Sequence, residues 1–304
     1  HSTGHISVLG SEIFFPAFLG TPVVASDGTA YLSSDNTAVY AVDKHGNRTD
    51  PITVTGTTGS TTKEPLLALD DDQGRLYVTS QDQSGNFKQQ AFDTATATTT
   101  GGAKELWSVE ADRDDVGYSG DRVASSFSSA GGGVVVSFLG AYVFGLDAAT
   151  GDELWRFGCD GLLAADEGNV APLLNEDGTR TFVACYDNKI TNFTALEVAS
   201  GEEAWSASFD NQYNAQCFAY EAATGLVYCL KASDFHVYDG ATGEEQWTAS
   251  DALGYTPLLD NANGVAKCDG GHHECTDFGP PADYAPPPRN EQKPPAPAVT
   301  GAAA

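Results

Sequence analysis

Three stretches of this chain carry the same phrase: FGLDAATGDELWRF (144–157), ALEVASGEEAWSAS (195–208) and VYDGATGEEQWTAS (237–250). In each, strand-forming residues end in an acid, a turn of small residues with glycine follows, and a second strand carries tryptophan. A weaker copy is AFDTATATTTGGAKELWSV (91–109). A degenerate copy without tryptophan is YAVDKHGNRTDPITV (40–54). The phrase therefore recurs five times.

The spacing of the copies decides the fold. The acids lie at intervals of 50, 54, 50 and 42 residues, at Asp43, Asp93, Asp147, Glu197 and Asp239. All four tryptophans of the chain occupy the same place in the repeat: Trp107, Trp155, Trp205 and Trp247. A period of this length with several strands in each repeat predicts an all-β propeller of four-stranded blades. No stretch shows a helical period of adequate length.

The strand pattern places five full blades at about 20–56, 63–110, 121–159, 168–210 and 214–251. Residues 255–268 match only the first two strands of a further blade, and residues 5–15 precede the first blade without one of their own. A propeller must remove its free sheet edges. We therefore expect a composite sixth blade built from 255–268 and 5–15. The alternative is an incomplete sixth blade whose missing strands another chain supplies.

After the propeller, predicted over 1–277, the composition changes. Residues 278–304 hold eight of the fourteen prolines, which exclude a helix interior or a central strand. The sequence predicts an extended, proline-rich tail, either a spacer or a strip that docks on a partner.

The chain carries 42 acidic against 15 basic residues, a formal net charge of −27. This balance excludes a phosphate-binding face and thus nucleic-acid binding, and it disfavours anionic membrane surfaces. The acidity indicates solubility in salty or extracellular water, or acidic loops that hold Ca²⁺. No run of eighteen apolar residues indicates a membrane span.

Six cysteines and two glycosylation sequons favour an oxidising, extracytoplasmic compartment: secreted, periplasmic or luminal. Cys217 and Cys229 flank a turn symmetrically and would face each other in a hairpin; Cys268 and Cys275 would close a small loop, which leaves Cys159 with Cys185. Buried thiols are the alternative for all six. The sequons make Asn47 and Asn192 candidate glycosylation sites.

The repeats resemble those of the PQQ-like (quinoprotein-like) β-propellers, most strongly in the third to fifth blades and over about 20–268. The resemblance implies that the four tryptophans dock one blade on the next and take no part in chemistry. The family includes PQQ-dependent dehydrogenases and also non-enzymatic scaffolds, such as outer-membrane assembly lipoproteins.

The chain departs from the enzymes of that family. Those enzymes are eight-bladed and about twice as long, and they carry adjacent cysteines over the cofactor. No two cysteines are adjacent here, and nothing matches the calcium and catalytic-aspartate segment. The resemblance therefore implies the fold and the non-enzymatic branch, since fold alone does not carry function.

Two weaker metal sites are possible from the residue types. His272 and His273, between Cys268 and Cys275, offer ligands for Zn²⁺ or Cu. The alternative for this segment is a loop closed by a disulfide. Asp70 and Asp72 lie in one of three acidic turns that resemble short Ca²⁺ loops. The alternative for each is an ordinary hairpin turn, which also uses Asp, Asn and Gly. The structural alternative is favoured for both, and no catalytic residue is predicted.

The sequence thus predicts a non-enzymatic, extracytoplasmic scaffold that binds other protein subunits through an open blade edge or its tail. The alternatives are a quinoprotein-type oxidoreductase and a carbohydrate-binding propeller, for which the twelve tyrosines would supply stacking surfaces.

Overall fold

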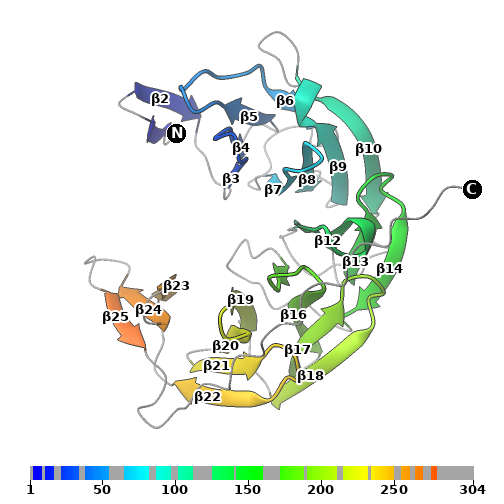
Figure 1. Cartoon of the computed structure of the whole chain (residues 1–304), viewed down its shortest axis with the longest axis vertical. Coiled ribbons are helices and arrows are strands. Elements are labelled where there is room, and N and C mark those ends of the chain that lie inside the picture. The colour runs from blue at the N-terminus through cyan, green and yellow to red at the C-terminus, as the bar shows by residue number, and fades with distance from the viewer. Residues whose placement is uncertain are drawn as a thin grey trace, which may run out of the picture.

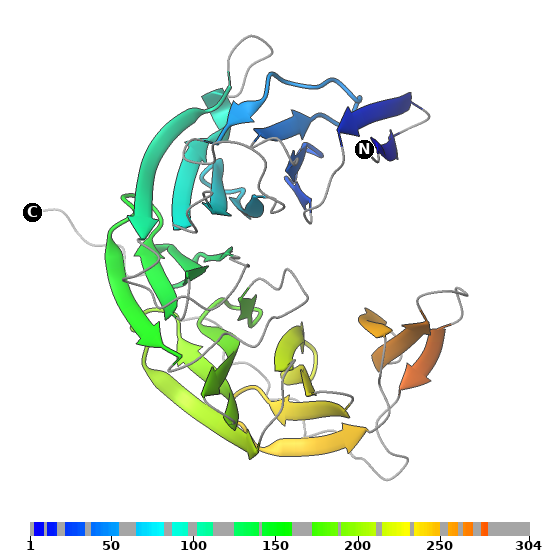
Figure 2. The same ribbon diagram turned by 180° about the vertical axis from the view of Figure 1, so that it is seen from behind.

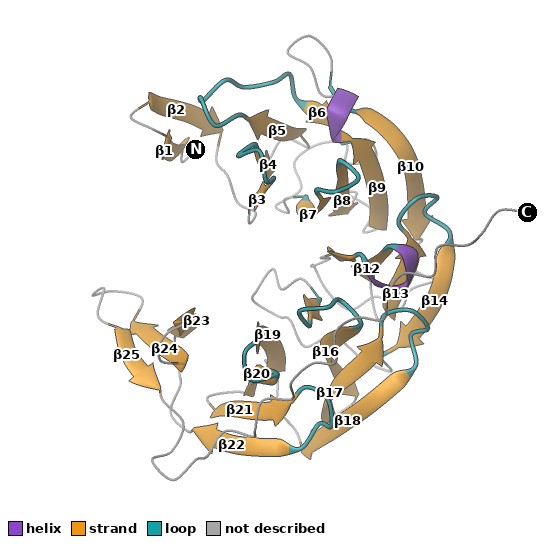
Figure 3. Ribbon diagram, in the orientation of Figure 1, coloured by secondary structure: helices purple, strands orange, loops and turns teal. Residues whose placement is uncertain are grey.

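The computed structural model describes residues 3–8, 11–16, 22–33, 38–54, 65–81, 87–96, 102–111, 125–139, 142–159, 172–187, 190–210, 215–231, 234–249, 255–260, 264–269 and 275–278. These residues form sheets arranged along an open arc (Figure 1). In this part of the chain, helix is confined to the 3₁₀ turns η1 (Thr94–Thr96) and η2 (Ala130–Gly132), shown in purple in Figure 3. None of the described helices is long and apolar enough to cross a membrane.

Five four-stranded antiparallel sheets make up most of the arc, and their strands pair in chain order. The first contains β3 (Val23–Val24), β4 (Ala30–Ser33), β5 (Ala38–Val42) and β6 (Ile52–Thr53). The second contains β7 (Leu66–Asp70), β8 (Arg75–Gln81), β9 (Phe87–Asp93) and β10 (Lys104–Ala111). The third contains β11 (Ser125–Ser128), β12 (Val134–Leu139), β13 (Tyr142–Asp147) and β14 (Glu153–Gly158).

The fourth sheet contains β15 (Leu173–Leu174), β16 (Arg180–Asp187), β17 (Ile190–Glu197) and β18 (Glu203–Asp210). The fifth contains β19 (Ala215–Glu221), β20 (Leu226–Lys231), β21 (Asp234–Asp239) and β22 (Glu245–Ala249). The fourth strands β10, β14, β18 and β22 follow one another along the outer rim (Figure 1). The predicted all-β propeller fold is confirmed.

Each rim strand from β10 to β22 has a β-bulge just before its tryptophan. In β14, Trp155 pairs with Gly145 and Glu153 pairs with Leu146, so Leu154 between them has no partner. The same irregularity occurs in β10, β18 and β22. The extra residue turns outward, and Leu154 is accordingly 49% exposed. The bulge thus points the tryptophan side chain toward the interior, while the residue before the tryptophan faces solvent.

The core lies between the blades. Each of four clusters of buried apolar side chains joins two adjacent sheets; the cluster between the fourth and fifth sheets, for example, contains Phe182, Trp205 and Val227. A blade buries its faces only against its neighbours, because a lone four-stranded sheet leaves both faces in water. Burial of one such side chain stabilises the fold by about 1.5–3 kcal/mol.

The two ends of the arc carry smaller sheets. At the amino-terminal end, β1 (Thr3–Val8) pairs with β2 (Ser11–Pro16). At the other end, β23 (Tyr255–Asp260), β24 (Gly264–Asp269) and β25 (Cys275–Phe278) form a three-stranded sheet. The view from behind shows the same opening between these two sheets (Figure 2).

The described strands do not form the expected composite sixth blade. Residues 5–15 pair with each other in the hairpin β1–β2, and 255–268 pair in sequence with the third strand β25. In the described part of the chain the sixth unit is therefore an incomplete blade, which was the other form that the sequence allowed. The local hairpins satisfy backbone hydrogen bonds at low loop-closure cost, whereas a composite blade must join the two ends of the chain. β25 also extends the sheet to Phe278, the first residue of the expected tail, and the remainder of that tail lies outside the described residues.

Candidate functional site

The acid that ends the third strand of a blade folds the turn that follows it. Asp147 Oδ1 accepts hydrogen bonds from the backbone N–H groups of Ala149 and Thr150, at 2.8 and 2.9 Å. Asp239 Oδ1 does the same for Ala241 and Thr242, at 2.9 and 2.8 Å. A short carboxylate can satisfy turn donors in this way. Asp147 and Asp239 are therefore structural groups at the blade turns.

Each of these turns receives a tryptophan from the preceding blade. Trp107 Nε1 donates to the carbonyl of Ala148 at 3.1 Å, and Trp155 Nε1 donates to the carbonyl of Val198 at 2.7 Å. Trp205 Nε1 donates to the carbonyl of Gly240 at 3.1 Å. In all three contacts the acceptor is the residue directly after the acid. The tryptophans of the second to fourth blades thus join each blade to the next.

The turn glycine makes room for the indole ring. Gly201 has φ +70°, and a Cβ added there would lie 2.6 Å from the ring atoms of Trp155. Gly151 and Gly243 have the same relation to Trp107 and Trp205, with φ +80° and +74°. Only glycine combines a left-handed backbone with so close an approach. The small-residue turn in the repeat therefore has a physical reason.

Two arginines reinforce the junctions, and the sequence analysis did not identify them. Arg75 Nη1 donates to the carbonyl of Ala148 at 3.4 Å. Arg180 Nη1 donates to the carbonyl of Gly240 at 3.1 Å, and its Nε lies 2.9 Å from Glu197 Oε1. Both arginines open the second strand of a blade. That shared position is the signal that would have identified them.

A tyrosine lies at the same junction as Arg75. Tyr77 is completely buried, and its hydroxyl donates to the carbonyl of Ala148 at 3.3 Å. Burial raises the pKa of Tyr77 to about 12, because the phenolate would lose its hydration. Tyr77 is therefore present at this junction as the neutral phenol.

Trp247 departs from the pattern of the other tryptophans. It lies in β22 at the same place in the repeat and is 8% exposed, like Trp155. Its Nε1 donor is buried, but it has no hydrogen-bond acceptor within the described part of the chain. At the carboxy-terminal end of the five blades, the tryptophan of the docking contact is thus buried, but within the described residues its hydrogen bond is not made.

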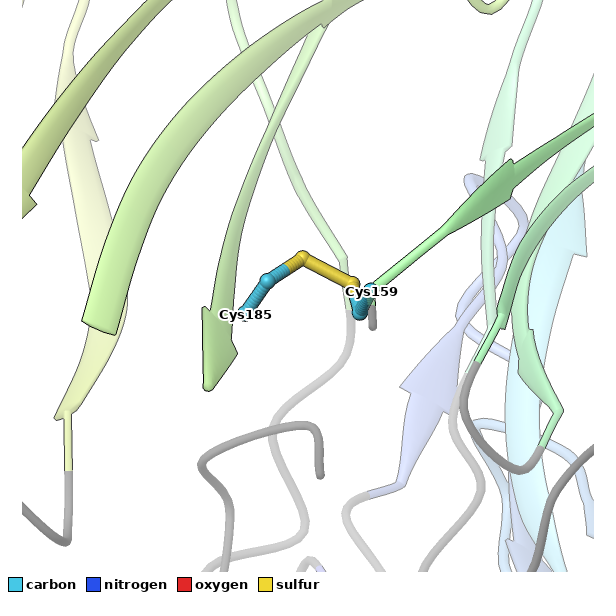
Figure 4. The surroundings of a disulfide bond; sticks show 2 residues. All are labelled: Cys159 and Cys185. Atoms are coloured by element: carbon cyan, nitrogen blue, oxygen red, sulfur yellow. A yellow bond between two sulfur atoms is a disulfide. The ribbon is translucent and has the colours of Figure 1, made fainter. Parts of the chain in front are cut away.

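Two disulfides lie within the described blades. Cys159, just after β14, bonds to Cys185 in β16 and so crosses from the third sheet to the fourth (Figure 4). Cys217 bonds to Cys229 within the fifth sheet, where the two are paired on neighbouring strands. Cys268 and Cys275 are backbone partners in β24 and β25, and their side chains lie outside the described residues.

The acidic turn at Asp70 and Asp72 lies at the junction of the first and second blades. Asp70 is buried, which raises its pKa, and its Oδ1 accepts a hydrogen bond from the N–H of Gln73 at 3.1 Å. Asp71, between Asp70 and Asp72, accepts a hydrogen bond at its Oδ2 from the N–H of Ser26, near the first sheet, at 2.7 Å. The described residues contain no group of three or more His, Cys, Asp or Glu side chains placed to hold a metal ion. His272 and His273 lie outside those residues.

The two sequons differ in environment. Asn47 is exposed at the turn after β5, where its Nδ2 donates to Asp43 Oδ2 at 2.8 Å. Asn192 lies in the middle of β17 with a paired strand on each side, and Thr194 of its sequon is 2% exposed. An enzyme that modifies the folded protein would therefore reach only Asn47.

Comparison with solved structures shows the propeller fold. BamB from Moraxella catarrhalis matches with a TM-score of 0.54 and 14% identity, over 90% of this chain and 78% of that one. The Dos1 propeller matches with a TM-score of 0.57 and 14% identity, over 90% and 73%. A family model described as outer membrane protein assembly factor BamB matches residues 10–156 and 142–270. Comparison with curated proteins finds no match.

Proposed function

This chain belongs to the PQQ-like propeller family described as outer membrane protein assembly factor BamB, and on that premise we propose that it is a non-enzymatic, extracytoplasmic scaffold that binds other protein subunits of a larger assembly. One observation carries the proposal: among the residues that the structure describes, the arc ends in sheets of fewer than four strands. β25 is the edge of a three-stranded sheet, whereas each of the five full blades has a fourth strand. An edge strand presents unpaired backbone groups that a strand of another protein can pair with.

The repeated residues support a scaffold rather than an enzyme. The acids, glycines and tryptophans that recur in the blades form turns and junctions, and an active site would need residues that break this repetition. The family name, which refers to assembly at an outer membrane, supports a role in an assembly. The disulfides Cys159–Cys185 and Cys217–Cys229 support an oxidising compartment.

Site-specific photo-crosslinking tests the proposal. A photoreactive residue such as p-benzoylphenylalanine replaces Thr276 in the edge strand β25, and in a matched control it replaces Ala149, an exposed residue of a rim turn. In the source organism, we expect one defined protein to be crosslinked from position 276 and not from 149. A native mass spectrum of the unmodified complex should contain the same protein. A monomer in that spectrum, or equal crosslinking from both positions, would contradict the proposal.

Thermal denaturation with PQQ and Ca²⁺ tests the quinoprotein alternative. A ligand that binds only the folded state at 100 times its dissociation constant stabilises that state by about 2.7 kcal/mol. We expect no shift in the melting temperature at saturating concentrations. A rise of several degrees would make this chain a cofactor-binding propeller and would refute the non-enzymatic assignment.

A further inference from the structure

The four junctions between the full blades differ in the side chains that they bury. Among the described residues, the junctions of the second with the third sheet and of the fourth with the fifth each bury four aromatic side chains: Tyr77, Phe87, Trp107 and Phe144 in the one, and Phe182, Phe193, Trp205 and Tyr238 in the other. The other two junctions each bury two: Tyr31 and Phe92 between the first and second sheets, and Phe138 and Trp155 between the third and fourth. Each aromatic side chain buries about 150–250 Å². Junctions rich and poor in aromatic area therefore alternate along the arc.

The two junctions rich in aromatic residues share a stacked pair of rings. Tyr77 in the second strand of the second blade stacks on Phe127 in the first strand of the third, with ring centroids 5.5 Å apart. Phe182 in the second strand of the fourth blade stacks in the same way on Tyr220 in the first strand of the fifth, at 5.8 Å. This contact thus recurs after two blades rather than after one.

Between the third and fourth blades, aliphatic side chains occupy the positions of these rings. In strand register, Val136 of the third blade lies at the position of Tyr77 in the second. Leu174 of the fourth blade lies at the position of Phe127 in the third. The stacked contact is therefore replaced by smaller side chains at this junction.

The arginine contact follows the same alternation. Arg75 of the second blade and Arg180 of the fourth each donate to a turn carbonyl of the next blade, at 3.4 and 3.1 Å. Both pair with the acid that ends the third strand of their own blade. In the third blade, Val134 is the residue that pairs with this acid. This position therefore provides no guanidinium for the junction of the third and fourth blades.

A covalent bond crosses the junction of the third and fourth blades. The disulfide Cys159–Cys185 joins the end of the third blade to the second strand of the fourth (Figure 4). The hydrogen bond from Trp155 to Val198 holds the same junction at the turn of the fourth blade. Cys185 lies five residues along β16 from Arg180, which is about 17 Å from that turn. The disulfide thus holds the end of the junction that Trp155 does not reach.

We propose that the second and third blades (66–158) form one unit, that the fourth and fifth (173–249) form another, and that Cys159–Cys185 is a redox-dependent clamp which makes the two units one body. Reduction by a dithiol breaks the bond between the two Sγ atoms; two electrons and two protons pass to the cysteines, and the dithiol becomes a disulfide. Trp155 and the apolar cluster around it then hold the junction alone, and the units open independently. This inference goes beyond the proposed function and does not depend on it.

Native-state hydrogen exchange of the purified full chain in increasing denaturant tests the two units. With the disulfides intact, the inner strands of the second to fifth blades should exchange as one group. In Cys159→Ala/Cys185→Ala, the strands β8 to β13 and β16 to β21 should separate into two groups whose exchange rates differ roughly tenfold, because each unit opens on its own. A division inside either unit, or one undivided group in this variant, would overturn the proposal.

Cys217→Ala/Cys229→Ala is the matched control, because it removes the disulfide that lies within the fifth sheet. Its second, third and fourth blades should still exchange as one group. A division between the third and fourth blades in this control would show that loss of any disulfide separates the units, and would refute the role of Cys159–Cys185 as the clamp.

Reduction of the folded wild-type chain tests the redox dependence without a variant. Dithiothreitol should produce the same two exchange groups, and reoxidation should restore one. In Cys159→Ala/Cys185→Ala the boundary should not move on reduction, which assigns the effect to this bond. A bond that dithiothreitol cannot reduce in the folded protein, or reduced blades that exchange as one group, would overturn the proposal. Either failure would leave the crosslink from position 276, and hence the proposed function, unaffected.

Discussion

The indole nitrogen of Trp155 lies 2.7 Å from the carbonyl oxygen of Val198, and this hydrogen bond joins the rim strand of the third blade to the turn of the fourth. Gly201 of the same turn lies against the indole ring. One side chain thus fills the gap between two sheets and satisfies a turn carbonyl. Since the third and fourth blades each make both halves of this contact, the stability of each depends on its neighbours.

The space under Trp155 predicts a large cost for Gly201→Ala. The new methyl would meet the indole ring at 2.6 Å, and the residue would keep a φ of +70°. We expect a loss of about 2–4 kcal/mol in the free energy of unfolding, from steric displacement and left-handed backbone together. Chemical denaturation measures it.

Gly132→Ala is the matched control for that substitution. Its φ is +96°, and an added Cβ would meet nothing within 4 Å. It should therefore cost only the backbone strain, about 1–2 kcal/mol. Equal losses for Gly201→Ala and Gly132→Ala would show that the ring contact is unimportant.

Comparison of Trp155→Phe with Trp247→Phe measures the docking hydrogen bond. Trp155→Phe removes a bond and leaves a buried carbonyl, whereas Trp247→Phe removes a donor for which the described residues hold no acceptor. We expect Trp155→Phe to lower the free energy of unfolding by about 1–2 kcal/mol more than Trp247→Phe does. Denaturation curves that coincide would contradict this.

The buried phenol of Tyr77 predicts instability in alkali. Its pKa is raised to about 12 in the folded protein, above the ordinary value of 10.0. The neutral form is favoured by folding, so the stabilisation is complete below pH 10 and is lost as the pH rises toward 12. Two pKa units correspond to about 3 kcal/mol.

Tyr77→Phe tests this assignment. At pH 7 the variant loses the bond to Ala148 and should be about 1 kcal/mol less stable than the wild type. Between pH 10 and 12 the deficit should shrink or reverse, because phenylalanine does not ionise. A difference that stays constant from pH 7 to 12, measured by denaturation at each pH, would exclude Tyr77 as the titrating group.

The two disulfides should differ in their contribution. Cys159–Cys185 spans 26 residues and crosses a blade boundary, whereas Cys217–Cys229 spans 12 residues within one blade. The longer loop predicts about 0.7 kcal/mol more stabilisation through the unfolded chain, and each bond contributes about 2–4 kcal/mol. Denaturation of the two paired Cys→Ala variants compares them. A larger loss for the Cys217–Cys229 pair would refute this order.

The environments of the two sequons predict one modification site. Peptide mass mapping of the protein from its source should find a glycan on Asn47, which is exposed, and none on Asn192, which lies within β17. A glycan on Asn192 would mean that modification precedes folding of the fourth blade.

The sequence by itself determined the repeated parts of this protein. The five repeated acids from Asp43 to Asp239, together with the four tryptophans, predicted five blades. The symmetric flanks of one turn predicted that Cys217 would face Cys229. These features follow from local pattern: strand alternation, turn residues and a fixed period. They need no knowledge of what lies far away in the chain.

Only the tertiary structure decided what happens where the pattern ends. It placed residues 5–15 and 255–278 in separate sheets, gave Arg75 and Arg180 their acceptors in the next blade, and left Trp247 without an acceptor in the described part of the chain. A repeat specifies a contact between one blade and the next, but beyond the first and last full blades the described strands form shorter sheets without the full pattern. The curvature of the arc arises from the packing of whole sheets and is not encoded in any one repeat.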